Sequence, residues 1–415
     1  MLALLLYARP AEKFAKIVTV EAVGSPVVFR FLRDLRLADN PALTAAAARG
    51  PVIPVFIWDP RAEDPWPPGA ASRWWLHHSL QSLQAALEDL GASEVFSNPD
   101  PATLYSPAAI RTREGKPFQV FTPFHRSCLA APRPDAPLSS IPQLRAPARW
   151  PASESLDDLR LLPKTDWAAG LRETWQPGEP GAQKRLAVLA RLGDYATTRD
   201  RPAIEGTSRL SPHLHFGEVS PRQVWHASMT NPAFQRELLW REFAQHTLAH
   251  FPHTASESMR PEFRRFPWRH DPAGLRAWQR GLTGYPLVDA GMRELRQTGW
   301  MHNRVRMVVA SFLVKHLRID WREGAYWFWD TLVDADLANN TLNWQWAAGS
   351  GVDAAPYFRI FNPALQAAKF DPTGDYIRHW VPEIGTPAYP PPIVDHARAR
   401  AAALAAFAIL RAEHA

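Results

Sequence analysis

The chain has 415 residues, of which 46% are hydrophobic and 21% charged, a composition that excludes a disordered protein and predicts two or three folded domains. Its formal charge of +6 permits a polyanionic partner without requiring one, and an ordinary basic enzyme is the preferred interpretation of the charge alone. A single cysteine, Cys128, excludes an intramolecular disulfide and a multi-thiolate metal site, and it favours the reducing cytoplasm.

The chain begins with an apolar stretch, residues 1–6, which has no basic residue before it and is too short for a signal peptide. No apolar run is long enough to span a membrane, so we expect no membrane association. The 18 tryptophans are more unusual, because many lie beside Arg, Asn or Asp rather than in apolar runs. That placement indicates that the protein handles an aromatic or redox-active group.

The first elements predict an α/β domain. Residues 27–31 and 52–58 are short β-branched and aromatic runs, separated by the Ala-rich segment 42–48, which indicates the order strand, helix, parallel strand. Residues 72–90 then show helical spacing of apolar side chains, and Gly91 is a candidate C-cap for that helix.

Further βα units are hard to find, because residues 97–117 are mostly turn formers and residues 131–180 are rich in proline. From residue 183 onward the apolar spacing is helical almost throughout. We predict helices at 183–196, 221–229, 234–250, 273–281, 286–298, 300–317, 323–332 and 396–413. The expected organisation is an α/β domain at 25–130, an interdomain linker at 131–182 and a helical domain at 183–415.

Residues 206–212 read Gly-Thr-Ser-Arg-Leu-Ser-Pro and directly precede a helical stretch. Hydroxyls and backbone N–H groups at a helix start can hold a phosphate. An ordinary N-cap is the alternative, and for this segment alone it is the preferred interpretation.

Glu237, Trp240 and Arg241 have the spacing i, i+3 and i+4, so they share one helical face. An acid, an indole and a guanidinium side by side suit a flat heterocycle with an anionic tail. The alternative is a surface Glu–Arg pair, which is common on helices.

A second mixed stripe follows at the same helical spacing, with an indole, an amide, a cation and a thioether on one face. It consists of Trp300, Asn303, Arg304 and Met307. Such a stripe suits a pocket that stacks and hydrogen-bonds bases, and an interdomain contact is an equally good interpretation.

Residues 334–346 contain two carboxylates, three amides and two indoles. This content is too polar for a buried helix and too aromatic for a flexible loop. Asp334 and Asp336 have a D-x-D spacing, but the glycine and terminal glutamate of an EF-hand are missing, so we expect no metal.

Together these segments resemble the DNA photolyase/cryptochrome family. The resemblance is carried in order by the phrases at 207–211, 239–243, 283–290, 299–304 and 353–363, and residues 32–43 are similar to the opening strand and helix of that family. It covers about 27–129 with a gap and about 183–382 nearly continuously. The implied fold class is an α/β domain with a Rossmann-like parallel sheet, here truncated, followed by a large all-α FAD-binding domain.

The resemblance implies a U-shaped FAD inside the helical domain. By motif match, its contacts would come from Tyr195, Thr207, Ser208, Arg209, Leu210, Ser211, Arg241, Trp300, Asn303, Arg306, Asp334, Asp336 and Asn340. Asn340 stands at the family's position beside flavin N5, where repair enzymes carry Asn and plant cryptochromes carry Asp. This choice favours repair.

The implied reaction is the splitting of a cyclobutane pyrimidine dimer in DNA by an electron from light-excited reduced FAD, which needs no metal. A lesion pocket and DNA contacts would be formed by Arg199, Glu237, Trp240, Asn303, Arg304, Met307 and Trp346. Trp268, Trp321 and Trp344 match the family's chain of tryptophans that carries electrons to the flavin. With Glu237 and Asn340 they are the expected catalytic residues.

Three departures from the family pattern shape the remaining expectations. About 24 residues precede the first strand, the last two or so βα units are largely missing between Gly91 and Phe118, and a Trp-containing loop is omitted after Pro382. Phe234 also stands where a flavin-side Trp is frequent. We therefore expect a weak or absent antenna pigment of the folate or deazaflavin type. The expected protein is a cytoplasmic monomer whose partner is dimer-containing DNA. The alternatives are a cryptochrome-type photoreceptor, which usually carries a C-terminal extension, and a remnant that binds DNA without repair.

Overall fold

The computed structural model of the protein describes residues 5–7, 26–61, 65–88, 103–141, 143–147, 149–189, 191–354 and 358–412. The chain forms two compact units that are interleaved along the sequence. The first comprises Met1–Leu104, Pro134–Arg191 and Ser208–Thr230, and the second comprises Tyr105–Arg133, Leu192–Thr207 and Asn231–Ala415. The division into 25–130, 131–182 and 183–415 stays a prediction.

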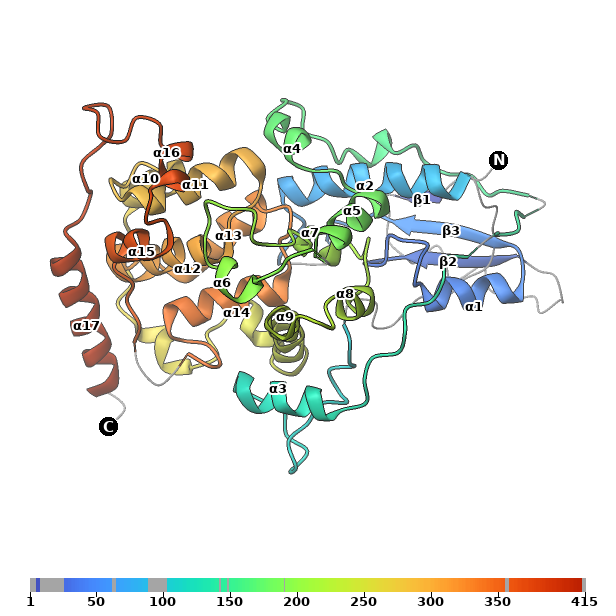
Figure 1. Ribbon diagram of the computed structural model, residues 1–415, viewed down its shortest axis with the longest axis horizontal. Coiled ribbons are helices and arrows are strands. Elements are labelled where there is room, and N and C mark those ends of the chain that lie inside the picture. Colours follow the sequence, from blue (N-terminus) through green and yellow to red (C-terminus); the bar gives the residue numbers. More distant parts are fainter. Residues whose placement is uncertain are drawn as a thin grey trace. The chain divides into compact units, whose positions relative to one another are not determined.

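A small parallel sheet organises the first unit (Figure 1). Its strands are β1 (Leu5–Tyr7), β2 (Val27–Phe31) and β3 (Val52–Ile57), in the order β1-β3-β2. The predicted parallel pairing of β2 with β3 is confirmed, since Val27 lies opposite Val52 and Phe31 opposite Phe56. The sequence does not predict β1, because a three-residue strand is too short to show an alternating pattern.

The helices of the first unit begin with α1 (Pro41–Arg49), where the Asn40 side chain accepts a hydrogen bond from the Leu43 N–H at 3.1 Å. The predicted helix after β3 is α2 (Ala70–Glu88), and its predicted cap Gly91 lies outside the described residues. The remaining helical turns of this unit are η2 (Asp157–Leu159), α4 (Ala169–Thr174), α5 (Glu179–Leu189), α7 (Ser211–His215) and α8 (Pro221–Ala227).

Buried charges fix the loop that follows β2. Asp39, with a φ of 49°, accepts hydrogen bonds from Ser220 and pairs with Arg222. Arg36 donates to the Gly217 carbonyl at 2.9 Å and to the Asp39 carbonyl. Because buried charges are tolerated when they are paired and hydrogen-bonded, this network ties the loop to the segment 217–222.

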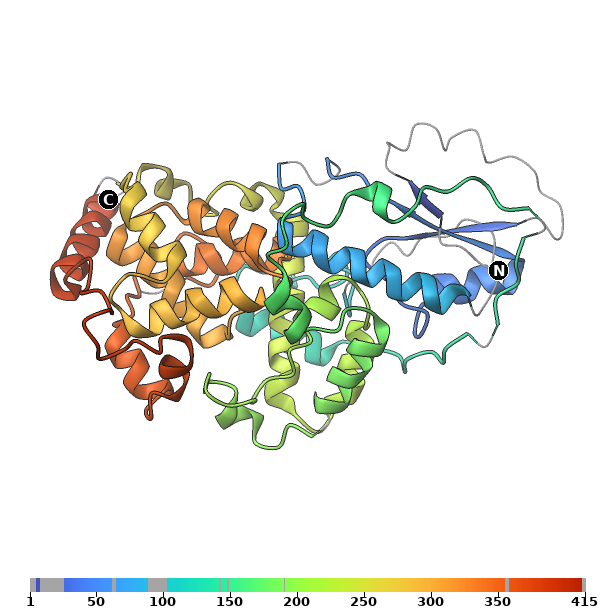
Figure 2. The same ribbon diagram turned by 90° about the horizontal axis from the view of Figure 1, so that it is seen from above.

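The second unit is helical (Figures 1 and 2). Its first members are α3 (Phe121–Ala130), α6 (Tyr195–Thr198), α9 (Pro232–His250), η3 (Pro252–Ala255), η4 (Pro261–Arg265), α10 (Pro272–Arg280) and α11 (Pro286–Thr298). It continues with α12 (Asn303–Ser311), the π-helical turn η5 (Phe312–Leu317), α13 (Trp321–Thr331), α14 (Leu337–Ala348), α15 (Pro363–Phe370), α16 (Asp375–Trp380) and α17 (His396–Ala412). In both views α17 runs along the outer edge of this unit.

Local chemistry accounts for the ends of the predicted helices. Pro232 and Pro286 occupy first-turn positions, where their missing N–H has no intrahelical role, and Gly281 and Gly299 follow helices with φ of 63° and 66°. The predicted helix at 300–317 starts only at Asn303 and turns π-helical from Phe312.

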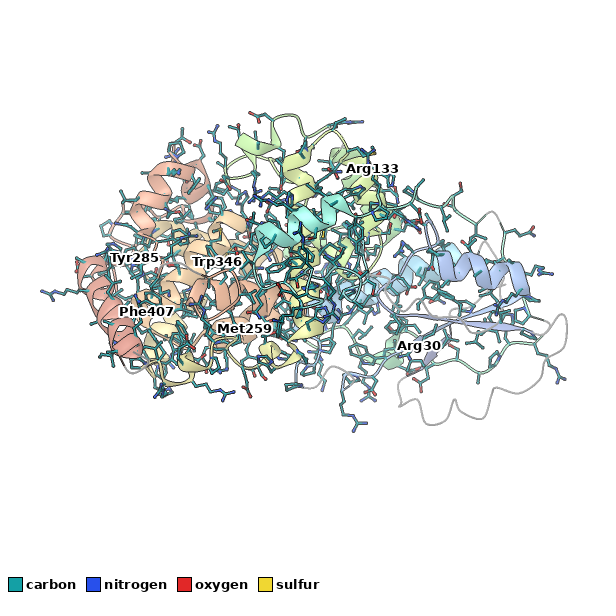
Figure 3. All side chains as sticks on the ribbon, turned by 90° about the horizontal axis from the view of Figure 1, so that it is seen from below. Arg30, Arg133, Met259, Tyr285, Trp346 and Phe407 are labelled. Atoms are coloured by element: carbon teal, nitrogen blue, oxygen red, sulfur yellow. The ribbon has the colours of Figure 1, made fainter. Side chains whose placement is uncertain are left out.

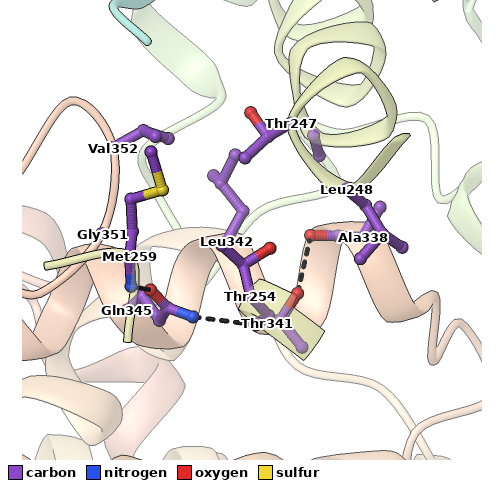
Figure 4. Close-up of a pocket in the computed structure, with 11 residues that line it drawn as sticks. Thr247, Leu248, Thr254, Met259, Ala338, Thr341, Leu342, Gln345, Gly351 and Val352 are labelled. Carbon is purple, nitrogen blue, oxygen red and sulfur yellow. Dashed lines mark hydrogen bonds between the residues drawn. The ribbon is translucent and has the colours of Figure 1, made fainter. Parts of the chain in front are cut away.

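The interpretation of residues 334–346 as too polar for a buried helix is wrong, because most of this segment is the largely buried helix α14. Its polar side chains are buried together with partners. The Gln345 amide accepts from the Met259 N–H at 2.8 Å and donates to the Thr254 carbonyl at 2.8 Å, as the close-up shows (Figure 4). The Thr341 hydroxyl donates to the Leu337 carbonyl at 2.8 Å. Burial of polar groups costs little when each one is hydrogen-bonded.

In the part of the chain that the structure describes, no helix combines the length and apolar character required to cross a bilayer.

Candidate functional site in the helical unit

The acid, indole and guanidinium predicted on one helical face lie on α9. Glu237 forms its ion pair with Arg199, which follows α6, while Arg241 lies 3.6 Å from the carboxylate of its neighbour Glu242. The alternative interpretation, a surface ion pair between Glu237 and Arg241, therefore does not hold, because Glu237 pairs with Arg199. Glu237 is a partly buried carboxylate held from another segment of the chain.

A second ion pair continues this network onto α12. Arg304 donates to Asp200 through Nη2 at 2.7 Å and through Nε at 3.3 Å, and its guanidinium lies 4.3 Å from the centre of the Phe370 ring. Its Nη1 is 3.8 Å from the sulfur of Met307. Because Asp200 directly follows Arg199, four of the predicted lesion-pocket residues are brought together: Arg199, Glu237, Arg304 and Met307. The sequence analysis missed Asp200, although it is adjacent to a predicted residue.

Near the start of α12 a buried ion pair lies among the predicted FAD contacts. Arg306 donates to the Asp334 carboxylate at 2.9 and 3.1 Å and to the Met301 carbonyl at 2.7 Å. Its guanidinium lies 5.8 Å from the Trp300 ring. Asn303, at the first position of the helix, is exposed. The pair presents a cation and a carboxylate at the same place, which matches the alternating donors and acceptors of a heterocycle edge.

Asp336 and Asn340 are held in defined orientations by α9 and α13. The Asp336 carboxylate accepts from the Asn339 N–H at 2.9 Å, as the N-cap of α14, and from Gln245 at 3.0 and 3.1 Å. The Asn340 Nδ2 donates to the Ala325 carbonyl at 2.9 Å. This hydrogen bond orients the amide, so its oxygen points away from Ala325 as an acceptor.

The hydroxyl-rich segment is divided between the two units, with Thr207 in the second and Ser208–Ser211 in the first. Ser208 accepts a hydrogen bond from the Leu210 N–H at 3.3 Å, and Arg209 has a φ of 53°. Leu210 occupies the N-cap of α7 without a side-chain cap, so the alternative of an ordinary side-chain N-cap does not apply. The FAD contacts assigned to these residues stay a prediction.

Tyr195 lies at the start of α6 and packs against Phe234, with ring centres 5.1 Å apart. Burial raises the pKa of its hydroxyl to about 12, so the phenol is neutral at physiological pH.

The three tryptophans of the predicted electron chain differ in exposure. Trp344 on α14 is 2% exposed, Trp321 at the start of α13 is fully buried, and Trp268 is partly exposed within the Phe263–Phe266 cluster. The Trp321 indole donates to the Ser258 hydroxyl at 3.3 Å. Trp268 is therefore the most exposed of the three, and their role as an electron chain stays a prediction.

Helix α3, which the sequence analysis did not predict, forms an aromatic contact with the candidate site. Phe121 stacks on Trp240, with ring centres 3.7 Å apart and planes 9° apart. The preceding segment is held by His246, whose Nε2 accepts the Phe118 N–H at 3.0 Å. Burial lowers the pKa of His246 to about 4, so it is a neutral acceptor. Phe121, Phe124 and Cys128, at i, i+3 and i+7, are the buried residues of this helix, and their spacing is the sequence pattern that could have indicated it.

Trp346, labelled in Figure 3, is half-buried, and the guanidinium of Arg359 lies 5.1 Å from its ring centre. Among the described residues no group of three or more His, Cys, Asp and Glu side chains is arranged to hold a metal ion. In the D-x-D segment, Asp334 pairs with Arg306 and Asp336 caps a helix.

Comparisons with known proteins give matches along most of the chain. The family profile "DNA photolyase" matches residues 27–103, and the profile "FAD binding domain of DNA photolyase" matches residues 234–388. A deoxyribodipyrimidine photo-lyase of Agrobacterium fabrum is 43% identical over 93% of this chain and 98% of that protein. Cryptochrome-2 of Arabidopsis thaliana is 38% identical over 85% of this chain and 70% of that protein. The crystal structure of a bacterial class III photolyase from Agrobacterium tumefaciens has a TM-score of 0.87 and 41% identity, covering 95% of this chain and 99% of that one.

Proposed function

This chain belongs to the DNA photolyase and cryptochrome family, and from that membership we propose that it is a deoxyribodipyrimidine photo-lyase that repairs cyclobutane pyrimidine dimers with light. The observation that carries the proposal is the 43% identity to a photo-lyase over 98% of the length of that enzyme. Asn340 supports repair over light sensing, because an amide at this position is the choice of the family's repair enzymes.

The helical unit binds FAD, and its buried polar side chains suit that cofactor. Arg306 with Asp334, and the oriented amide of Asn340, form a set of donors and acceptors matched to the edge of an isoalloxazine. When bound in its reduced state, FAD supplies the light-excited electron that splits the dimer.

Asn340 acts through the fixed orientation of its amide and through its lack of charge. Its Nδ2 is fixed on the Ala325 carbonyl, so its Oδ1 offers a hydrogen-bond acceptor without adding charge. The Arg306–Asp334 pair supplies a cation, and the Asp334 carboxylate holds the Arg306 guanidinium in place. These contacts fix the orientation of both groups, which limits the reorganisation that electron transfer requires.

The lesion is bound by the network of α6, α9 and α12. Trp240 and Trp346 offer aromatic surfaces on which a flipped dimer stacks, and Glu237 hydrogen-bonds the bases. Arg199 holds Glu237, and Asp200 holds Arg304, so these ion pairs orient the polar groups of the pocket. A dimer is extruded at lower cost than an intact pair because its stacking is already weakened.

Trp268, Trp321 and Trp344 return an oxidised cofactor to its reduced state by passing an electron inward from the surface. Indole suits this task because it is oxidisable without a permanent buried charge. The decrease in burial from Trp344 to Trp268 supports the direction of this path.

A blue-light receptor is the second candidate, which the 38% identity to a plant cryptochrome favours. The test illuminates chemically reduced protein with a dimer-containing oligonucleotide and follows the recovery of thymine absorbance. Repair with turnover supports the photo-lyase. Absence of repair, together with flavin photoreduction in a separate sample of oxidised protein, supports the receptor. If neither occurs, the chain is a DNA-binding remnant.

A matched variant separates the two light reactions. Trp321→Phe interrupts the tryptophan chain, so it should abolish photoreduction of the oxidised protein. The same variant should repair dimers normally after chemical reduction, because the repair electron comes from the cofactor. A dark sample controls for spontaneous recovery.

The expectations of a monomer and of a cytoplasmic location remain part of this proposal, the latter supported by the single cysteine. Weak or absent antenna use also remains part of it. The missing βα units on which it depends begin after Gly91, and residues 89–102 lie outside the described residues.

A further inference from the structure

Helix α3 supplies a contact to the lesion pocket that the two matched family regions do not contain. Residue 121 lies between the matched ranges 27–103 and 234–388, and its segment, 105–133, belongs to the helical unit. Phe121 is 1% exposed and stacks almost parallel on Trp240 at 3.7 Å. Trp240 itself is only half-buried, so one part of the indole is covered while another part is left accessible.

Two further groups, one ring and one cation, contact this stacked pair. Phe243 meets Trp240 edge-on at 5.8 Å and Phe121 at 5.9 Å. The Arg236 guanidinium lies 5.6 Å from the Phe121 ring centre. The Phe121 ring is therefore in contact with Phe243 and Arg236 as well as with the Trp240 indole.

The backbone of α3 is anchored to the loop that follows α14. Asp353 accepts the Phe121 N–H at 3.2 Å and donates its own N–H to the Gln119 carbonyl at 3.2 Å. Asp353 has a φ of 52°, an uncommon conformation for a residue other than glycine. This loop follows the helix that carries Trp346.

We propose that Phe121 is a positioning residue for lesion binding, which holds the Trp240 indole in the plane on which the dimer stacks, with Asp353 as its anchor. This inference rests on the proposed function. Without Phe121 the indole loses its stacked neighbour, and binding the dimer must then restrict more of its rotation about the two side-chain bonds.

The test compares Phe121→Leu with Phe124→Leu. Both are buried phenylalanines of α3, but Phe124 packs on Phe118, Phe243 and His246, and among the described residues its ring does not contact that of Trp240. The contribution of one aromatic pair to binding corresponds to a change of about fivefold in affinity. Phe121→Leu should therefore weaken binding of dimer-containing DNA by about this factor, with undamaged DNA bound as before. Phe124→Leu should leave dimer affinity unchanged, and Phe121→Tyr should restore it.

A second measurement follows the indole itself. In protein labelled with 5-fluorotryptophan, the ¹⁹F resonance of Trp240 is assigned by its loss in Trp240→Phe. Phe121→Leu and Asp353→Ala should each shift or broaden this resonance, because the ring current and the restraint of Phe121 are lost or displaced. Phe124→Leu should leave it in place.

The outcomes separate the inference from the proposed function. Equal loss of dimer affinity in Phe121→Leu and Phe124→Leu, or an unshifted Trp240 resonance in Phe121→Leu, overturns the positioning role. A wild-type protein without repair activity overturns the proposed function alone, because the ¹⁹F measurement needs no catalysis. Weakened dimer binding by Phe121→Leu only, with a shifted resonance, supports the inference.

Discussion

Adding one methyl group at Gly324 tests whether α13 and α14 are packed as the structure describes. A Cβ at this residue would lie 2.1 Å from the outer ring of Trp344, where 3.4 Å is the lower limit of ordinary contact. Trp344 is 2% exposed and is the inner member of the proposed electron chain. Gly324→Ala therefore forces the indole or a helix to move by about 1 Å.

Two effects of opposite sign set the magnitude. Replacing a helical glycine by alanine stabilises a helix by about 1 kcal/mol, whereas overpacking a core costs about 1 to 3 kcal/mol or more at a severe clash. We expect overpacking to win, with a net loss of about 2 kcal/mol in the free energy of unfolding.

The assay is urea unfolding of matched samples with the same flavin content, together with the rate of flavin photoreduction. In a Trp344→Phe background the outer indole ring is absent, so Gly324→Ala should become neutral or stabilise by up to about 1 kcal/mol. A Gly324→Ala protein that is as stable as the parent, with Trp344 present, would refute the packing argument.

Two further predictions concern charge. Arg306→Ala should lower the free energy of unfolding by about 3 kcal/mol and release FAD, because it leaves the Asp334 side chain, only 3% exposed, with an uncompensated charge. Replacing Arg306 and Asp334 together by leucine should recover most of the stability in urea unfolding, while flavin absorbance after gel filtration stays low. Recovery of both the stability and the flavin absorbance would contradict the assigned cofactor role. His246 must be neutral to accept the Phe118 N–H, and burial lowers its pKa to about 4. Its contribution to stability is therefore complete above the unfolded pKa of about 6.5. That contribution is lost as the pH falls toward 4. Unfolding measured between pH 7 and 4 should show a loss of about 3 kcal/mol from this group, and His246→Gln should flatten that dependence. An unchanged slope in His246→Gln would show that other groups carry it.

Local sequence patterns were enough to predict most of the helices. Proline at the first turn marks α9, α10 and α11 in the sequence. A glycine follows the last turn of α10 and of α11, and the apolar spacing of these two helices is regular. These features act within a few residues, so one sequence is enough to predict them. The parallel pairing of β2 and β3 follows from the same kind of evidence.

Local sequence patterns did not predict which polar residues are buried. Asn340 and Gln345 are compatible with a buried helix only because the Ala325 and Thr254 carbonyls, on other elements, accept their hydrogen bonds. Nothing in the composition of residues 334–346 indicates where those carbonyls lie.

The sequence by itself determined which residue types stand at helical spacing on α9 and α12, and hence the candidate site. Only the tertiary structure decided their partners: Glu237 pairs with Arg199 rather than with Arg241 one turn away, and Phe121 covers Trp240 from a segment far earlier in the chain. The physical reason is that helix geometry fixes contacts at i+3 and i+4, whereas long-range contacts depend on how separate segments pack together.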